Sequence, residues 1–312
     1  MSPEVSVLVP AYNTEAYIVR AIESALRQTE KNIEVIVVDD GSTDATVEVA
    51  RSIPDKRLKV LVNQKNIGVS GARNCALREA KGKWIAVLDS DDWYAPERLE
   101  KLLQVAYVED ADLIADDLYF IRDGENSPQT TFLLKTGLQI DKIRQIDAVT
   151  FVETDMPGQR VLSLGLTKPL LKREFLVQHG IEYDETIEIG EDFAFYLKCL
   201  VSGARFILIP EAYYFYRASQ GSLVTQSRVK HFNQSWRLTL NFLQEEEVVK
   251  NNPALVRALS KNLAAFEKNI AYYSVVEPIK RGDLLEALIE MVHNPYFIVH
   301  FLTKMLKFIY RT

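Results

Sequence analysis

The chain has 312 residues, of which 47% are hydrophobic and 26% are charged, and its formal net charge is −6. This length suffices for one large domain with a smaller appendage, and the composition is that of an ordinary globular enzyme. The negative charge argues against nucleic acid as a partner, because duplex binding needs a basic face.

The first ninety residues alternate short apolar runs with helical patterns. Four short apolar runs predict strands, the first of them buried, and the segments between them carry helical patterns. Strands that are separated by helical crossovers indicate a doubly wound α/β fold with a mostly parallel sheet. The expected strands are Val5–Val9, Glu34–Val38, Leu58–Val62 and Trp84–Leu88, and the expected helices begin near Tyr17, near Thr43 and at Ser70.

The pattern weakens between Arg122 and Asp155, which suggests an irregular excursion or lid. Order returns over Leu162–Lys172 and continues with a helix that begins at Glu191. A pair of strands is then expected over Arg205–Arg217.

After Gln226 the spacing becomes helical. We therefore expect an α/β domain over residues 1–225 and an all-helical C-terminal region over residues 226–312. Three prolines are expected to interrupt the helices of this region, namely Pro253, Pro278 and Pro295.

Polar clusters follow three of the predicted strands. In open α/β sheets, ligands bind outside the carboxyl ends of the strands. The clusters at those ends are Tyr12–Asn13, Asp39–Asp40 and Asp89–Asp92. Their convergence predicts a ligand site at this edge of the sheet.

Asp89-Ser90-Asp91 directly follows a strongly apolar strand. Hard divalent cations prefer carboxylate and phosphate oxygens, and proteins often hold Mg²⁺ through only one or two carboxylates. A carboxylate at this point can place a cation against a diphosphate and neutralise charge on a leaving group. Asp-x-Asp patterns are common in loops, so the position after the strand is what makes this one informative.

Asp39–Asp40 allows two interpretations. Ser42, Thr43 and Asp44 suit a turn into a helix, which would give the pair a structural capping role. Alternatively, one of the two carboxylates accepts a hydrogen bond from a nucleotide base or ribose. The residues alone leave both interpretations open.

Several of these motifs, in this order and spacing, resemble family 2 glycosyltransferases of the GT-A fold. The resemblance covers residues 4–225 and does not extend to the helical C-terminus. Its motifs are Val5–Asn13, Val37–Asp44, Asn66-Ile67-Gly68, Ala72-Arg73-Asn74, Leu88–Asp92, Leu166-Thr167-Lys168 and Gly190-Glu191-Asp192.

The resemblance implies a nucleotide-sugar donor, with UDP as the expected nucleotide, and a divalent metal cofactor, Mn²⁺ or Mg²⁺. The implied acceptor is a saccharide or a lipid-linked saccharide in cell-surface polysaccharide or glycolipid synthesis. The implied binding residues are Pro10, Ala11 and Tyr12 around the base, Asp40 at the base edge, Arg73 near the nucleotide, Asp89 near the ribose and Asp91 on the metal.

Asp192 matches the catalytic base of the family. The chemistry needs such a group, because an acceptor hydroxyl must lose its proton as it attacks the anomeric carbon. A single in-line displacement inverts the configuration at that carbon. The alternative for Asp192 is a carboxylate that stabilises a helix N-terminus. The alternative for Arg73 is an ordinary salt bridge on a helix face.

Two further residues near the site have less certain roles. Asp92 is either an orienting neighbour of the metal site or a helix cap. Arg217 either clamps a phosphate or lies solvated in a loop.

Three other functions were compared with the transferase. A dinucleotide-binding oxidoreductase needs a Gly-rich turn after the first strand, where Pro10–Asn13 stands. A nucleotidyltransferase needs a Gly- and Arg-rich loop at the same place. A non-catalytic, nucleotide-sugar-binding scaffold subunit stays as the alternative, which turnover with a donor would exclude.

The sequence also bears on location. Cys75 and Cys199 are expected to be reduced thiols, the N-terminus lacks signal-peptide features, and no window reaches the roughly 18 apolar residues of a membrane span. We therefore expect a cytoplasmic protein. Residues 295–312 are rich in apolar side chains, contain Lys304, Lys307 and Arg311, and lack acids. This composition suits either a helix in the membrane interface or a helix packed on the protein.

Overall fold

The computed structural model describes residues 2–125, 127–133, 141–156, 164–218, 228–294 and Phe297. The chain forms two compact units, one of Met1–Thr154 with Arg160–Gln220 and one of Asp155–Gln159 with Gly221–Thr312. All the candidate site residues belong to the first unit. The functional boundary after residue 225 stays a prediction, because residues 219–227 lie outside the described part.

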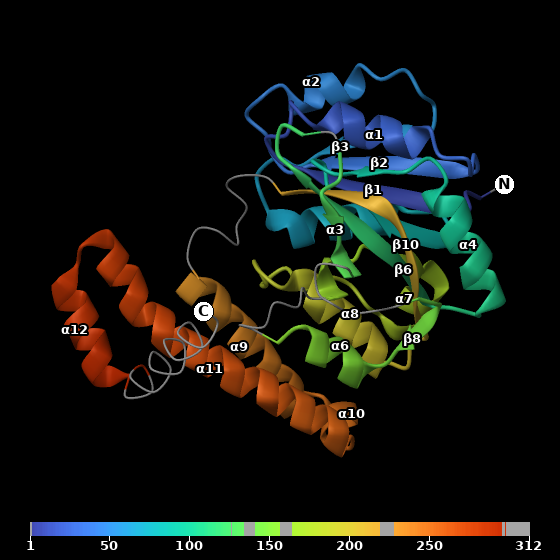
Figure 1. Ribbon diagram of the computed structural model, residues 1–312. Coiled ribbons are helices and arrows are strands. Elements are labelled where there is room, and N and C mark those ends of the chain that lie inside the picture. Colours follow the sequence, from blue (N-terminus) through green and yellow to red (C-terminus); the bar gives the residue numbers. More distant parts are fainter. Residues whose placement is uncertain are drawn as a thin grey trace. The chain divides into compact units, whose positions relative to one another are not determined.

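The first unit is built on a mixed, mostly parallel sheet (Figure 1). Within the described residues its order is β3-β2-β1-β4-β9-β6-β10-β5, with β7 beside β6 and β8 beside β10. The β1–β2, β2–β3, β1–β4 and β6–β10 pairs are parallel. The strands are β1 Val5–Ala11, β2 Ile33–Asp39, β3 Leu58–Val62, β4 Trp84–Val87, β5 Trp93–Tyr94, β6 Leu113–Arg122, β7 Thr130–Thr131, β8 Arg144–Ile146, β9 Leu170–Lys172 and β10 Phe206–Ala218.

Helices cover both faces of the β1–β2 part of this sheet. Figure 1 shows α1 and α2 on one side of these strands and α3 on the other. This arrangement confirms the predicted doubly wound α/β fold. The helices of the unit are α1 Ile18–Leu26, α2 Thr46–Arg51, α3 Gly68–Glu79, α4 Arg98–Val108, α6 Ala148–Thr154, α7 Arg173–His179 and α8 Glu191–Val201, with a short 3₁₀ turn, η1, at Leu164–Leu166.

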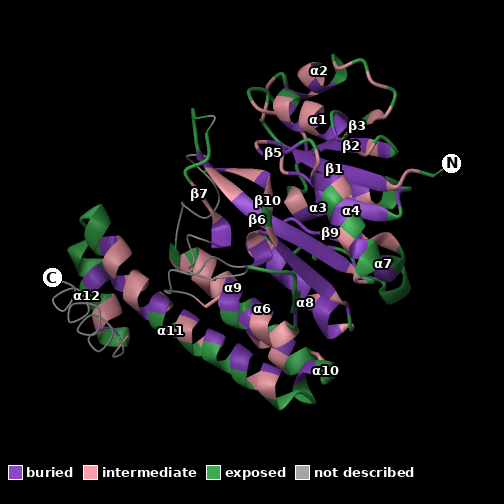
Figure 2. Ribbon diagram, turned by 45° about the vertical axis from the view of Figure 1, so that its right-hand side comes forward, coloured by how far each residue is buried: buried purple, intermediate pink, exposed green. Residues whose placement is uncertain are grey.

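The core of the first unit centres on β1. All seven residues of β1 are buried, and the strand pairs with β2 on one side and β4 on the other (Figure 2). Full burial of one Val or Leu side chain stabilises a fold by about 1.5–3 kcal/mol. Gly82, before β4, packs so tightly that a Cβ atom there would lie 2.4 Å from the backbone nitrogen of Ser6. The chain therefore needs glycine at this point.

Two details differ from the prediction. The expected pair of strands over Arg205–Arg217 was wrong, because β10 is one strand that continues through a register irregularity between Leu208 and Tyr214. Pro210 lacks a backbone N–H and stands at this irregularity, so it bends the strand without ending it. The segment 122–155, expected to be irregular, contains β7, β8 and α6 within its described part.

The second unit is helical, as predicted. Its described helices are α9 Arg228–Glu245, α10 Glu247–Lys250, α11 Pro253–Arg281 and α12 Leu284–His293. Pro253 begins α11, and the Asn252 side chain caps this helix by accepting the N–H of Leu255 at 3.1 Å. Pro278 was expected to interrupt a helix, but it lies inside the last turns of α11, which ends at Arg281 before Gly282. Among the described residues, no helix is both long and apolar enough to cross a membrane.

Candidate active site

The carboxyl ends of β1, β2 and β4 meet at one edge of the sheet, as the sequence predicts. Ala11 lies opposite Asp39 in the parallel register of β1 and β2. Pro10 and Ala11 are buried within β1, whereas Tyr12, the next residue, is 48% exposed. Of these three predicted binding residues, Tyr12 therefore presents a ring at the surface, where a flat ligand can stack on it.

Asp39 and Asp40 tie the loop after β2 to neighbouring backbone. Asp39 Oδ2 accepts the N–H groups of Gly41 and Ser42, at 3.2 and 3.0 Å, so Asp39 stabilises the turn after β2 and does not cap α2, which begins at Thr46. The Asp40 carboxylate accepts the N–H groups of Ile67 and Gly68, at 3.0 and 2.8 Å. Asp40 thus places a carboxylate at the N-terminus of α3, where the helix dipole favours negative charge. Whether it also binds a base stays a prediction.

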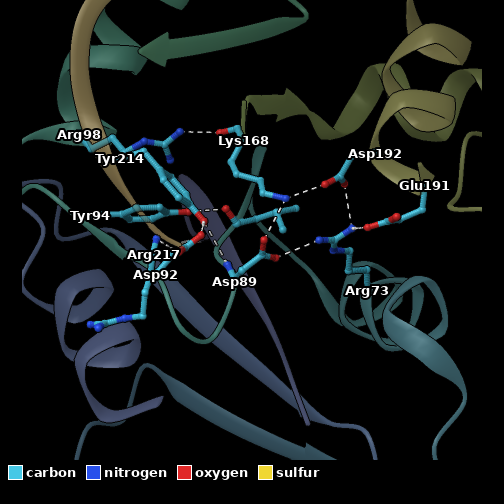
Figure 3. Close-up of polar contacts among 11 residues, drawn as sticks. Arg73, Asp89, Asp92, Tyr94, Arg98, Lys168, Glu191, Asp192, Tyr214 and Arg217 are labelled. Atoms are coloured by element: carbon cyan, nitrogen blue, oxygen red, sulfur yellow. Dashed lines mark hydrogen bonds and ion pairs between the residues drawn. The ribbon is translucent and has the colours of Figure 1, made fainter. Parts of the chain in front are cut away.

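Arg73 and Lys168 join Asp89 to Asp192 in a closed ring (Figure 3). The Arg73 guanidinium lies 2.9 Å from Asp89 Oδ1 and 2.8 Å from Asp192 Oδ1. The Lys168 ammonium lies 2.9 Å from Asp89 Oδ2 and 2.6 Å from Asp192 Oδ2. Each of the four carboxylate oxygens therefore has a cation partner. Arg73 also pairs with Glu191 at 3.0 Å.

The two cations of the ring are buried, and their burial affects the pKa values of the ring. The side chains of Arg73 and Lys168 are 2% and 4% exposed. Burial lowers the pKa of both cations, but the charges of Asp192 and Asp89 outweigh it, so both pKa values are raised. Burial raises the pKa of Asp89, but Lys168 and Arg73 lower it to a net value below the ordinary one. Burial and the charge of Asp192 raise the pKa of Glu191.

The positions of Arg73 and Asp192 bear on their alternative roles. Arg73 comes from α3 and is not an exposed salt-bridge residue, since it is buried and pairs with three carboxylates. Asp192 lies in the first turn of α8, and its carboxylate bonds the two cations. Both residues are therefore parts of one charged cluster that also contains Asp89.

The loop after β4 is fixed by the long strand β10. Asp92 accepts a hydrogen bond from the Tyr214 hydroxyl at 2.7 Å and one from the Arg217 backbone N–H at 2.7 Å. The Asp89 N–H donates to the same Tyr214 hydroxyl at 3.3 Å. Burial and the charges of Asp91 and Asp89 raise the pKa of Asp92. Asp92 is thus an orienting neighbour in the loop that carries Asp91.

Arg217 is buried, which excludes the solvated loop residue, one of the two alternatives for it. Its guanidinium carbon lies 5.0 Å from the ring centre of Tyr17 and 5.1 Å from that of Trp93. The side chain donates to the backbone oxygen of Asp91 at 3.1 Å and pairs with Asp123 at 3.2 Å. Arg217 therefore brings a positive charge to the same loop.

Sequence reasoning did not assign Lys168 to the site, although it lies in a quoted motif. It also did not identify Arg98, which holds the backbone of Lys168. Arg98 is fully buried, forms an ion pair with Asp116 at 2.7 Å and donates to the backbone oxygen of Lys168 at 2.5 Å. The signal in the sequence was the position of Lys168 in a motif that resembles the family. Its residue type gave no signal, because a lysine in a sequence usually indicates a solvated side chain.

Comparisons with known proteins agree with this geometry. The model of the family described as Glycosyl transferase family 2 matches residues 6–160. The succinoglycan biosynthesis protein ExoO of Rhizobium meliloti is 31% identical over 299 residues, which cover 96% of this chain and 84% of that protein. The chain belongs to the family 2 glycosyltransferases.

Solved structures show the same fold at low sequence identity. Staphylococcus aureus TarS, residues 1–349 in complex with UDP, superposes with a TM-score of 0.66 at 20% identity, covering 97% of this chain and 91% of that one. The mannosyltransferase PcManGT of Pyrobaculum calidifontis, in complex with GDP-Man and Mn²⁺, has a TM-score of 0.61 at 18% identity, covering 98% of this chain and 87% of that one. These likenesses confirm the GT-A fold of this family 2 glycosyltransferase.

The sequence predicts a divalent cation at the loop after β4. Within the described residues, His, Cys, Asp and Glu side chains form no group of three or more that could hold a metal ion. A Mg²⁺ ion that binds with a nucleotide needs only one or two carboxylates, because the phosphates supply other ligands. Asp89 and Asp92 are already engaged by cations and by hydrogen-bond donors. Asp91 belongs to the same loop, and its assignment as the metal ligand stays a prediction.

Proposed function

We propose that this glycosyltransferase moves one sugar from a UDP-linked donor to a hydroxyl group of a saccharide or lipid-linked acceptor, with inversion at the anomeric carbon. One observation carries the proposal. Asp89, after β4, and Asp192, on α8, share two buried cations, so a donor-side carboxylate and a base-side carboxylate form one cluster.

The donor side is assigned to the carboxyl ends of the first strands. Tyr12 stacks on the nucleotide base, and Pro10 and Ala11 shape the backbone that lies beside it. Asp40 reads the base edge, in addition to its bonds to the start of α3. Support for a UDP-linked donor comes from TarS, which has the same fold and binds UDP.

Asp89 and Asp91 are assigned to the ribose and the metal. Asp89 is held in place by Arg73 and Lys168, so its carboxylate has little freedom to rotate. A divalent cation held at Asp91 supplies neutralisation of the charge on the leaving diphosphate. Mn²⁺ in PcManGT, which has the same fold, supports the choice of Mn²⁺ or Mg²⁺.

Asp192 is assigned as the general base. The acceptor oxygen forms a bond to the anomeric carbon while the bond between that carbon and the diphosphate oxygen breaks. The acceptor proton passes to the Asp192 carboxylate, and the electron pair leaves with the nucleoside diphosphate. A single displacement of this kind inverts the configuration, and general-base help is worth about 10²–10⁴-fold in rate.

The pathway is proposed to be cell-surface polysaccharide or glycolipid synthesis in the cytoplasm. The support is the likeness to ExoO, a succinoglycan biosynthesis protein. Residues 295–312 are proposed to contact an anionic membrane, where such acceptors are made. Except for Phe297, these residues lie outside the described part of the chain.

The preceding helix supports this membrane contact. Five apolar residues of α12 are exposed, and the sequence that follows carries three bases and no acid. Apolar area and basic charge together favour binding to anionic lipid. The exposed residues are Leu284, Leu285, Leu288, Ile289 and Val292.

Vesicles of phosphatidylglycerol test the membrane proposal. We expect the full chain to sediment with them at low salt, and a chain with Lys304, Lys307 and Arg311 replaced by Glu to stay in solution while folded. These substitutions keep Phe297, which packs with Val275 and Ala287. A full chain that fails to sediment refutes the contact.

The transferase proposal is tested by ligand stabilisation and turnover. A ligand at about 100 times its Kd raises the free energy of unfolding by about 2.7 kcal/mol. In a thermal-shift screen of nucleoside diphosphates, we expect UDP to stabilise the protein more with Mn²⁺ than without it. The Asp91→Asn variant should lose the Mn²⁺ enhancement, because the amide lacks the charge that a hard cation needs.

A matched variant controls for the loss of one surface carboxylate. Asp110 has a side chain that is 94% exposed, so Asp110→Asn should keep the full Mn²⁺ enhancement. Equal enhancement in the parent and in Asp91→Asn refutes the metal assignment. UDP binding without turnover of any UDP-sugar, unchanged by Asp192→Asn, would identify a scaffold subunit instead.

A further inference from the structure

We propose that Lys168 is a positioning residue, which holds the Asp192 carboxylate in register with Asp89 for the transfer step. The inference rests on the proposed function of Asp192. It concerns a residue that touches neither the donor nor the acceptor in that proposal. Lys168 acts through the carboxylate that it binds.

The contacts of Lys168 show what it holds. Its ammonium lies 2.6 Å from Asp192 Oδ2 and 2.9 Å from Asp89 Oδ2. Arg73 occupies the other oxygen of each carboxylate. A carboxylate with one cation at each oxygen cannot turn about its terminal bond without breaking a charged contact. The two cations therefore set the planes of both carboxylates.

Arg73 and Lys168 have different tasks in the ring. Arg73 also pairs with Glu191, so its charge is shared among three carboxylates. The contacts of the Lys168 ammonium in Figure 3 go to Asp89 and Asp192. A compact ammonium fits between two carboxylate oxygens, whereas a planar guanidinium is longer and needs a different geometry.

A buried arginine, Arg98, holds the backbone of Lys168. Its carbonyl oxygen accepts a hydrogen bond from Arg98, whose side chain is fully buried and pairs with Asp116. Arg98 also lies over the Tyr214 ring at 5.0 Å. The hydroxyl of this tyrosine accepts the Asp89 N–H. The arginine of the buried Arg98–Asp116 ion pair therefore contacts both the Lys168 backbone and Tyr214, and Tyr214 binds the Asp89 N–H.

The contacts that hold the Asp192 carboxylate should affect the rate of the transfer step. Asp192 must meet an acceptor hydroxyl in line with the bond that breaks, and a misplacement of about 1 Å can cost about 10²-fold in rate. Without the Lys168 ammonium, Arg73 is the cation that still pairs with Asp192 among the described residues. We therefore expect Lys168 to affect kcat through Asp192 and to change the Kd of UDP less than kcat, because the rate depends on the in-line geometry at Asp192 more steeply than nucleotide binding depends on one ribose contact at Asp89.

The test is a double-mutant cycle of Lys168→Met and Asp192→Asn, with Lys59→Met as a control for an exposed lysine. We measure kcat, the KM of each substrate and the Kd of UDP with Mn²⁺. Lys168→Met should lower kcat by about 10²-fold and change the Kd of UDP by much less. The double variant should be no slower than Asp192→Asn alone, because residues that act as a unit are not additive.

A second variant guards against failure to fold, since Lys168→Met leaves three carboxylates with one cation. Lys168→Arg keeps the charge and should fold, with a kcat well below that of the parent and a Kd for UDP that changes much less than kcat. Parental kcat in Lys168→Arg, or a Kd that weakens as much as kcat falls, overturns the inference. So does a double variant that is slowed by the product of both single effects.

Failure of the proposed function looks different. It would appear as an Asp192→Asn enzyme with parental turnover, or as a parent without turnover. Thermal unfolding of the parent, Lys168→Met, Asp192→Asn and the double variant then still tests whether Lys168 and Asp192 are coupled. The double variant should lose less in Tm than the sum of the two single losses. Additive losses in Tm would show that Lys168 does not hold Asp192.

Discussion

Replacing Arg73 by Met tests whether the buried ring is held by charge balance. In the parent, Arg73 and Lys168 face Asp89, Asp192 and Glu191, so two cations meet three carboxylates. The variant leaves three carboxylates with one cation. Because the Arg73 side chain is 2% exposed, the variant removes a buried charge partner of these carboxylates. Removal of one partner from a buried ion pair costs about 3–5 kcal/mol, and we expect a loss of that size in the free energy of unfolding.

The loss should depend on pH in a defined direction. Burial and the charge of Asp192 raise the pKa of Glu191, while the charge of Arg73 lowers it. Removal of Arg73 therefore raises the pKa of Glu191 further. A carboxyl with a raised pKa in the folded state stabilises the fold below its unfolded pKa and loses this contribution as pH rises through the folded pKa. The deficit of Arg73→Met should therefore be larger near pH 8 than near pH 5.

The assay is urea unfolding at both pH values, with Arg78→Met as the matched control. Arg78 lies on the same helix, but its side chain is 56% exposed and pairs with Glu182 at the surface. Exposed pairs contribute only about 0–1 kcal/mol. If Arg73→Met loses no more stability than Arg78→Met, or if its deficit shrinks as pH rises, the charge-balance argument is wrong.

Three further outcomes follow from the site and the core. Asp192→Asn should lower kcat by about 10²–10⁴-fold with an unchanged Kd for UDP, and an enzyme that keeps a tenth of parental turnover would contradict the base assignment. Tyr12→Ala should weaken UDP binding by about 5- to 150-fold, as expected for the loss of one stacked base, in a calorimetric titration against the parent. Burial raises the pKa of the Cys199 thiol to about 12, so a thiol reagent near pH 8 should modify partly exposed Cys75 in the native protein and reach Cys199 only after unfolding. Equal rates for the two thiols would contradict the buried position of Cys199.

The parts that the sequence predicted well are those with local signals. The buried strands β1, β2 and β4 appear as mostly apolar runs, and the polar clusters that follow them converge because parallel strands end at one edge. Asp39 and Asp89 could be placed in this way from short stretches alone. The family resemblance added Arg73 and Asp192, whose meeting depends on residues that are 119 positions apart.

The parts that were missed depend on tertiary contacts without a local pattern. Lys168 and Arg98 are ordinary charged residues in the sequence. Folding buries them, Lys168 beside Asp89 and Asp192 and Arg98 beside Asp116. The strand β10 was divided wrongly, because Pro210 and Glu211 resemble a turn. Pairing with β6 on both sides of this point keeps the strand continuous. Tertiary context thus overrides a local preference here.

The geometry of Asp40 decides how the donor site can be tested cleanly. Its carboxylate accepts the N–H groups of Ile67 and Gly68 at the start of α3, and α3 carries Arg73. A substitution at Asp40 therefore disturbs the N-terminus of the helix that holds the charged ring, whether or not Asp40 meets a base. A loss of activity after such a substitution would have two physical causes that kinetics cannot separate. Tyr12 is 48% exposed and lies just beyond β1, so its ring can be removed with little effect on that helix. Nucleotide recognition is for this reason better measured at Tyr12 than at Asp40.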